Sequence, residues 1–276
     1  IKSKGIDTIE LVHGVTMLYG LTGDTGLLDI AQQQDQIILS GDGLKVAQAL
    51  DKGLATPYEF KSVAFGDGND GKQGALVVMR SDLGNSEHGS TVLFKPAAQG
   101  LGHGHFDKLT WQFYDHGNEI ISDYGAARFL NVEAKYGGRY LPENETYAKH
   151  TVAHNTVVVD ETSHFNSNVK VGNNNHPTLN FFETNKFGTV SSGEISTAYK
   201  GVRLERTLAL VDIPKLDKAV AFDIFTVEAD SNKQFDLPLH YHGQIIETNF
   251  PISANTKNLT AVGNKNGYQH LWLKAQ

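Results

Sequence analysis

The stretch GVRLERTLALVD, residues 201–212, shows the pattern that decides the fold. Apolar and polar residues alternate along it, which is the period of a β-strand with one buried face and one face exposed to water. Such alternation is typical of an antiparallel sheet that packs one face on a core. The same pattern returns along most of the chain after Pro57.

Short runs rich in Val, Ile, Thr and aromatic residues, separated by Gly, Asn and Asp, continue this pattern. The expected strands are 74–82, 90–97, 108–117, 118–125, 155–161, 178–184, 186–196, 201–212, 218–229, 236–246 and 268–274. The residues DHGNE between the third and fourth runs are typical of a hairpin turn. No helix-length apolar period interrupts the strands, so the sequence predicts an antiparallel β-sandwich.

The chain before Pro57 has a helical pattern instead. Leu11, Val15 and Leu18 stand at i, i+4 and i+7 within the first expected helix, 4–20, and two more helices are expected near 27–38 and 43–54. We therefore assign the fold class α+β, with domains at 1–58 and 59–276. The chain opens within a helix and closes within a strand, so we expect an interior piece of a longer protein whose sandwich is incomplete at its C-terminus.

Composition limits the classes of function. The 276 residues include 39% hydrophobic and 20% charged residues, as in an ordinary globular protein. The net charge of −7 argues against a nucleic-acid partner, and no apolar run approaches the ~18 residues of a membrane span. Cysteine is absent, so any metal must use nitrogen and oxygen ligands, and an exported location fits this absence.

His105, Asp123 and His154 are the candidate metal ligands. They stand in GHGHFDKL (102–109), ISDYG (121–125) and AHNTVVVD (153–160). Two imidazoles and a carboxylate suit zinc, and each residue borders an expected strand, so the three can converge on one sheet face. The alternative is that these are ordinary surface or core residues, because the chain has 12 histidines from which such a set can be drawn.

Two longer stretches resemble a known family. Residues 102–125, GHGHFDKLTWQFYDHGNEIISDYG, resemble the start of the heparinase II/III-like β-sandwich of polysaccharide lyases. Residues 125–165 resemble more narrowly the family 17 polysaccharide lyases, the oligoalginate lyases. The resemblance implies that 1–58 is the tail of an (α/α) toroid, and that His105, Asp123 and His154 hold a structural zinc.

The resemblance also implies the activity. These lyases cleave alginate oligosaccharides by β-elimination to unsaturated uronates, which requires neutralising the uronate carboxylate, removing the C5 proton and protonating the departing O4. We expect an exolytic enzyme that is periplasmic or secreted in a bacterium. Its partners would be an alginate oligosaccharide and the rest of the same polypeptide, and a homodimer is a further possibility. Such a toroid supplies further catalytic residues that we cannot place in 1–58, so this chain should hold half an active site.

Tyr140, His103 and Arg128 are the candidate catalytic and substrate-binding residues. Tyr140 follows two glycines in KYGGRYLPENE and matches an active-site tyrosine of the family; the alternative is a ring that anchors its loop. By resemblance, His103 matches a family residue that binds substrate and takes part in catalysis. Gly104 between them would let the His103 side chain point to substrate while the His105 side chain points to zinc. The alternative is that His103 is a hydrogen-bond partner of the metal site. Arg128 suits a uronate carboxylate, and an ion pair with Glu133 or Asp123 is the alternative.

Three other functions remain open from the residues. A heparin or heparan sulfate lyase of the same superfamily would favour a basic cleft, but acidic residues outnumber Lys and Arg by seven to five within 101–150. A zinc-dependent hydrolase would need a carboxylate base beside the metal, for which Asp107 is the local candidate. A non-catalytic carbohydrate-binding sandwich would show a row of exposed aromatic residues, and the chain has two Trp.

Overall fold

The computed structural model describes residues 6–81, 89–100, 103–123, 125, 141–213, 215–216 and 218–276. The chain divides into two compact units, 1–60 and 61–276. Along the described residues, no helix combines the length and the apolar character that crossing a membrane requires.

The first unit is a small three-helix assembly of α1 (Ile9–Thr22), α2 (Gly26–Gln34) and α3 (Asp42–Asp51). Its buried core consists of Leu28, Ala31, Val46 and Ala49. Gly23 ends α1 in the left-handed region, at φ 67°, and its N–H donates to the Tyr19 carbonyl at 2.8 Å. The three helices lie where the sequence predicts helices; the toroid they would belong to stays a prediction.

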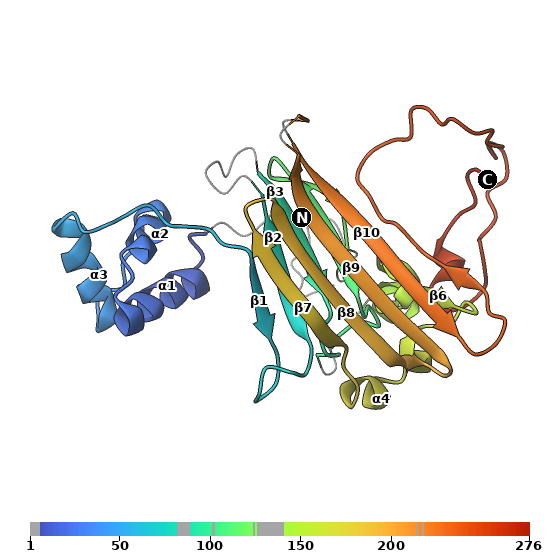
Figure 1. The fold of residues 1–276 in the computed structure, drawn as a ribbon, viewed down its shortest axis with the longest axis horizontal. Helices are drawn as coiled ribbons and strands as arrows, with labels where there is room; N and C mark the ends of the chain where they lie inside the picture. Colours follow the sequence, from blue (N-terminus) through green and yellow to red (C-terminus); the bar gives the residue numbers. More distant parts are fainter. Residues whose placement is uncertain are drawn as a thin grey trace. The chain divides into compact units, whose positions relative to one another are not determined.

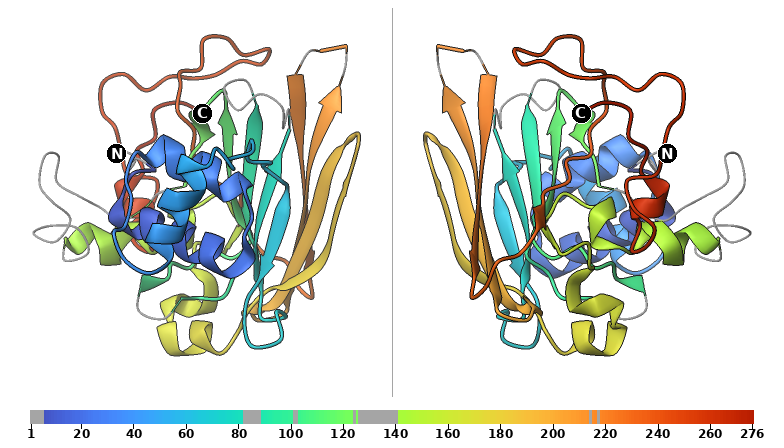
Figure 2. Two further views of the ribbon diagram at one scale, coloured as in Figure 1. Left: turned by 90° about the vertical axis from the view of Figure 1, so that its left-hand side faces the viewer. Right: turned by 90° about the vertical axis from the view of Figure 1, so that its right-hand side faces the viewer.

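The second unit contains two antiparallel sheets that lie face to face (Figures 1 and 2). One sheet has the order β1-β2-β3-β4-β5, with bounds Val63–Gly66, Ala75–Arg80, Ser90–Lys95, Thr110–Asp115 and Asn118–Ile121. The other has the order β10-β9-β8-β7, with bounds Lys218–Ala229, Val202–Ile213, Gly188–Tyr199 and Thr178–Asn185. The predicted antiparallel β-sandwich is confirmed.

The core of the sandwich follows from the alternation that opened the sequence analysis. Val202, Leu204, Leu208 and Leu210 of β9 point inward and are at most 3% exposed. They belong to one buried cluster with side chains from the facing sheet, among them Val77, Met79, Val92 and Phe94. Arg206 occupies an inward position of the same row, and its charge there requires partners within the core.

Short helical turns and a small third sheet join the two large sheets. The turns are Asn144–Ala148, Thr151–Ala153, His164–Ser167, α4 (Val169–Asn173) and Tyr268–His270. The small sheet pairs β6 (Val158–Val159) with β11 (Phe235–Asp236).

Three expected strands are largely wrong. The run 155–161 forms only β6, and 236–246 contributes Asp236 to β11 and otherwise meets β5 through a single bridge between Ile121 and Tyr241. The run 268–274 begins with a helical turn and pairs through a single bridge between Ala261 and Trp272. A period of two reports which face is buried, but a strand also needs a neighbour over its whole length.

Candidate functional site

The side chain of His154 lies beside both Asp123 and His105 in the sandwich unit. The Asp123 carboxylate contacts Nδ1 of His154. The ring centroids of His105 and His154 are 5.1 Å apart. His154 directly follows the turn Thr151–Ala153 and is fully buried, while Asp123 comes just after β5. Segments distant in the sequence thus meet at one cluster.

The contacts of His154 place its ring between two oxygen atoms. Nε2 lies 3.0 Å from the carbonyl oxygen of Ala148, which can only accept, so Nε2 carries the ring proton. In the neutral ring Nδ1 is then an acceptor, and it faces a carboxylate oxygen of Asp123, which is also an acceptor. Two facing acceptors need a proton or a metal ion between them.

His105 has the protonation state that metal binding requires. Burial, together with the nearby His154, lowers the pKa of His105 to about 4. The ring is therefore neutral at physiological pH and keeps a lone pair for a metal. The backbone of Gly104, just before His105, packs closely against the backbone of Gln99. A Cβ at position 104 would lie 1.2 Å from the Gln99 carbonyl oxygen, so only glycine fits there. His103, on the other side of Gly104, is exposed.

Asp107 is a second carboxylate beside the two histidines. Among the described residues, the set whose ligand atoms all lie within 4.8 Å of one another is His105, Asp107 and His154, and it does not include Asp123. However, Asp107 already pairs with Lys95 and, at 3.5 Å, with the fully buried Lys108. Burial alone would raise the pKa of Asp107, but the two ammonium groups outweigh it and hold the pKa well below its usual range. A carboxylate held in this way is a weak base.

Asn155 orders the cluster, a role that the sequence analysis missed. Its side-chain amide donates to the carbonyl oxygens of Trp111, at 2.9 Å, and Ser122, at 2.7 Å. Its side-chain oxygen accepts the N–H of His240 at 2.6 Å. Asn155 is fully buried and adjoins His154, and one of its partners adjoins Asp123. The available signal was its place directly after a candidate ligand.

Arg206 is the second residue missed. Its guanidinium forms a two-point pair with Asp223, at 2.7 and 2.6 Å, and also donates to the carbonyl oxygens of Leu109 and Asn155. A charged residue at an inward position of an apolar row was the signal that could have found it. Through the Asn155 carbonyl, Arg206 ties β9 to the segment that carries His154.

Arg128 and Tyr140 lie outside the described residues. Of the substrate-facing residues predicted from the sequence, the structure therefore describes His103 alone.

The comparisons with known proteins agree with this fold. Residues 66–275 match the family model of the heparinase II/III-like C-terminal domain. The chain belongs to this family.

Two curated relatives align with almost the whole chain. An exo-oligoalginate lyase of Saccharophagus degradans is 50% identical over 274 residues, which is 99% of this chain and 37% of that protein. An alginate lyase of Stenotrophomonas maltophilia is 48% identical over 276 residues, which is 100% of this chain and 37% of that protein. The chain thus spans little more than a third of the length of these relatives.

A solved structure supports the fold alone. A heparinase III gene product superposes with a TM-score of 0.59 over 87% of this chain and 31% of that one, at 14% sequence identity. At this identity the likeness extends to the architecture of the sandwich and to nothing finer.

Proposed function

We propose that the whole protein to which this chain belongs is an oligoalginate lyase, which cleaves alginate oligosaccharides by β-elimination to unsaturated uronate products. The observation that carries the proposal is the 50% identity over 99% of the chain to an exo-oligoalginate lyase. We extend the proposal to exolytic action, in which units are removed from a chain end.

Each step of the elimination can be given to a residue of this chain. Arg128 and His103 would neutralise and orient the uronate carboxylate, because an imidazole or guanidinium beside it makes the C5 proton more acidic. Tyr140 would move a proton, either as the base at C5 or as the acid at O4. His103 is exposed next to a buried cluster, which suits a group that meets substrate. The remaining groups would come from the rest of the polypeptide.

We also propose that His105, Asp123 and His154 hold a structural zinc. The facing acceptors of His154 and Asp123, and the neutral ring of His105, fit a cation bound by nitrogen and oxygen ligands. When bound, the ion would cross-link the segments that carry these residues. Asp107 is the less favourable third ligand, because binding would separate it from two lysines. The same pairing disfavours Asp107 as the base of a zinc-dependent hydrolase.

The decisive experiment supplies the full-length protein with alginate oligomers and, separately, with heparan sulfate. Elimination creates a conjugated uronate that absorbs in the ultraviolet, whereas hydrolysis releases sugar without this chromophore. We expect the chromophore from alginate alone. Chromophore formed from heparan sulfate instead would identify a heparin or heparan sulfate lyase. Sugar released without the chromophore would identify a zinc-dependent hydrolase. If neither sugar nor chromophore forms while alginate oligomers still bind, the protein is a binding module.

The role of Tyr140 is tested by Tyr140→Phe, which removes only the hydroxyl. We expect binding of alginate oligomers to persist and turnover to fall by about 10²–10⁴-fold. Tyr58→Phe is the matched control, because Tyr58 stands in the helical unit outside the matched motifs, and it should retain activity. Full activity of Tyr140→Phe would make Tyr140 a packing residue.

The zinc is tested by elemental analysis of the purified full-length protein. We expect one zinc per chain, lost in His105→Ala and retained in His13→Ala, a matched exposed histidine of α1. Exchange of zinc for cobalt should leave turnover nearly unchanged if the ion is structural, whereas a shifted pH–rate profile would indicate a metal-bound nucleophile. Zinc retained in full by His105→Ala would contradict the assignment. Export from the cell and a homodimer stay predictions.

A further inference from the structure

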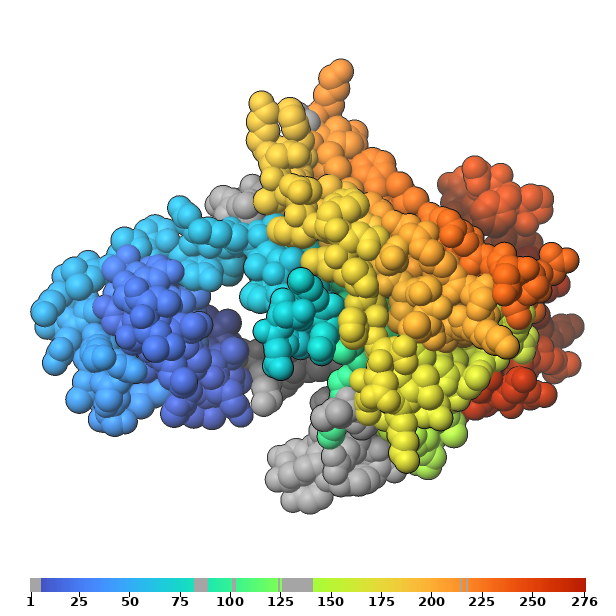
Figure 3. All heavy atoms as spheres, turned by 60° about the horizontal axis from the view of Figure 1, so that its bottom comes forward, coloured from blue at the N-terminus to red at the C-terminus, as the bar shows by residue number. Residues whose placement is uncertain are grey.

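The sandwich unit contains a second polar hollow that the proposed lyase chemistry does not use. It has a volume of about 460 Å³, within the ~300–1,000 Å³ of typical small-molecule sites. Its walls come from the segment 159–171, from residues 197–200 at and just after the end of β8, and from Lys233. In Figure 3 the segment around α4, in yellow and yellow-green, lies beside the gold strands. None of its lining residues is His105, Asp123 or His154.

The backbone of the hollow is held in an unusual conformation. Of the nine described residues other than glycine with positive φ, five lie within 160–167: Asp160, Glu161, Phe165, Asn166 and Ser167. Phe165 at φ 57° is notable, because bulky side chains rarely adopt the left-handed region. Residues held in sparsely populated conformations cluster at ligand-binding sites, where the surroundings over-determine them.

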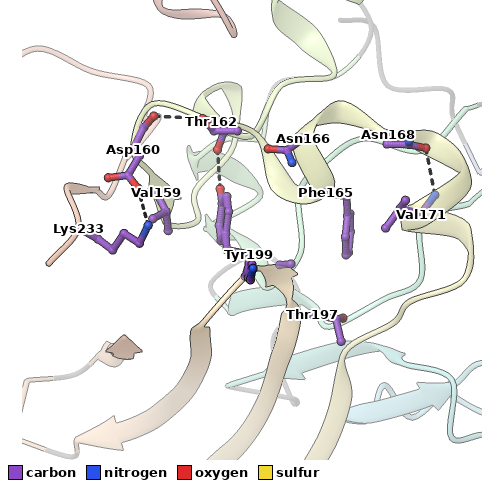
Figure 4. Close-up of a pocket in the computed structure, with 12 residues that line it drawn as sticks. Val159, Asp160, Thr162, Phe165, Asn166, Asn168, Val171, Thr197, Tyr199 and Lys233 are labelled. Atoms are coloured by element: carbon purple, nitrogen blue, oxygen red, sulfur yellow. Dashed lines mark hydrogen bonds and ion pairs between the residues drawn. The ribbon is translucent and has the colours of Figure 1, made fainter. Parts of the chain in front are cut away.

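Three polar groups of the hollow have no partner among the described residues. They are the side-chain amide of Asn166, the hydroxyl of Thr197 and the ammonium group of Lys200, all on exposed residues. Other polar groups of the wall are already bonded, as Figure 4 shows: Tyr199 donates to the Thr162 carbonyl at 2.8 Å, and Lys233 pairs with Asp160 at 3.1 Å.

Charge and shape indicate an anionic, ring-shaped ligand. Two lysines and one aspartate line the hollow, so it is locally positive on a chain whose net charge is −7. The buried rings of Phe165 and Tyr199, which are 6% and 9% exposed, form the apolar floor, and Figure 4 shows Asn166 and Thr197 on opposite sides of these rings. An apolar floor flanked by an amide, a hydroxyl and a cation matches a pyranose ring that bears hydroxyls and a carboxylate.

We propose that this hollow is a second, non-catalytic binding site for a uronate unit of the substrate chain. The carboxylate would pair with Lys200, the ring hydroxyls would bond to Asn166 and Thr197, and one face of the sugar would rest on Phe165. The identity of the sugar rests on the proposed function, whereas the site itself rests on the groups that line the hollow. Such a site would hold an alginate oligomer on the protein between eliminations.

The test is calorimetric titration of the full-length protein with a mannuronate hexamer, in the Tyr140→Phe background and at low temperature to suppress turnover. We expect two binding events per chain. The double variant Asn166→Gly, Lys200→Gln should lose one event or weaken it by about tenfold or more, as expected when charge-assisted bonds are removed. Glycine is chosen at 166 because it accepts the positive φ and removes only the amide.

Two controls make the result specific. Lys72→Gln removes an exposed lysine of the β1–β2 loop, outside the hollow, and should leave both events unchanged. Cellohexaose, a neutral hexamer, should not bind in the hollow. A thermal melt of the double variant that matches Lys72→Gln shows that its fold is retained.

The outcomes separate this site from the proposed function. If alginate yields the chromophore while the double variant binds the hexamer like its parent, the hollow is not a uronate site and the lyase assignment stands. If the double variant loses one event while no chromophore forms, the hollow stands and the lyase assignment fails. Equal binding of cellohexaose in the hollow would overturn the anionic specificity.

Discussion

Two adjoining stretches of the chain, 151–157 and 159–168, differ in burial and in backbone conformation. Within 151–157, Thr151, His154, Asn155 and Thr156 are fully buried, and each polar side chain has a bonded partner. Within 159–168, several polar side chains are exposed and five residues have positive φ. The first part is fixed by side-chain hydrogen bonds to distant segments, whereas the second is held in left-handed backbone conformations and exposes the Asn166 amide without a partner among the described residues. The first therefore suits a structural centre, and the second a site that meets a ligand.

This comparison predicts that the first part and its bonding partners are far more sensitive to substitution. Arg206 of β9, which donates to the Asn155 carbonyl, should show the largest effect. Arg206→Met leaves Asp223 without its partner and two buried carbonyls with one donor fewer. Breaking a buried pair from one side costs about 3–5 kcal/mol. We expect a loss of stability of this size, measured by scanning calorimetry of the full-length protein.

Arg203→Met is the matched control for Arg206. Arg203 stands on the same strand but on the outer face, where it pairs with Glu194 and Glu205 in contact with water. Exposed pairs contribute little, so its loss should be much smaller. Equal losses for the two variants would mean that the inward position of Arg206 does not govern its contribution.

Asn155 should show the next largest effect. Asn155→Ala removes two donors to strand carbonyls and the acceptor for the His240 N–H, all within the interior. We expect a loss of about 1–3 kcal/mol, and a fall of about 10–100-fold in zinc affinity because Ser122 would no longer fix the residue beside it. Calorimetry and competition with a zinc chelator measure the two effects.

The control for this variant is Asn180→Ala, on the exposed surface of β7, where the amide meets Glu205 at 3.3 Å. It should change neither the stability nor the zinc affinity appreciably. Unchanged zinc affinity in Asn155→Ala would show that Asn155 supports the fold without positioning the metal ligands.

The sequence was sufficient for the fold because burial on one face imposes a period of two, which is visible in 201–212 without any knowledge of partners. It also singled out His105, Asp123 and His154 by residue type and motif, and the zinc that they are proposed to hold stays a prediction. Both inferences depend on a residue's own chemistry and on its local pattern.

The contacts of Asn155 could not be predicted in this way. Its partners are backbone groups of Trp111, Ser122 and His240, which every residue possesses, so no composition marks them. The hollow has the same difficulty, because Phe165 adopts a conformation that its own preference opposes. Arg206 could be predicted in part. Its inward position in the alternating pattern indicates a buried charge, but its partner Asp223 is identified only by the pairing of β9 with β10.

The smallest predicted effect has the opposite sign and sharpens the comparison. Asp160 and Glu161 both have positive φ, at 51° and 52°, and the N–H of Thr162 donates to the Val159 carbonyl at 3.0 Å. This is a two-residue turn of the type that favours Asp-Gly. Glu161→Gly should therefore relieve the strain of a left-handed side chain and, after the entropy lost by glycine, stabilise the protein by about 0.5–1 kcal/mol. The gain would appear as a higher melting temperature.

Glu161→Ala is the control that separates conformation from charge. It removes the same carboxylate but retains a Cβ, so it should give no comparable gain. A similar rise in melting temperature for both variants would attribute the effect to the lost charge near Asp160. A gain for glycine alone would show that the segment 159–168 holds its shape against local backbone preference, as expected of a part of the chain maintained for what it binds.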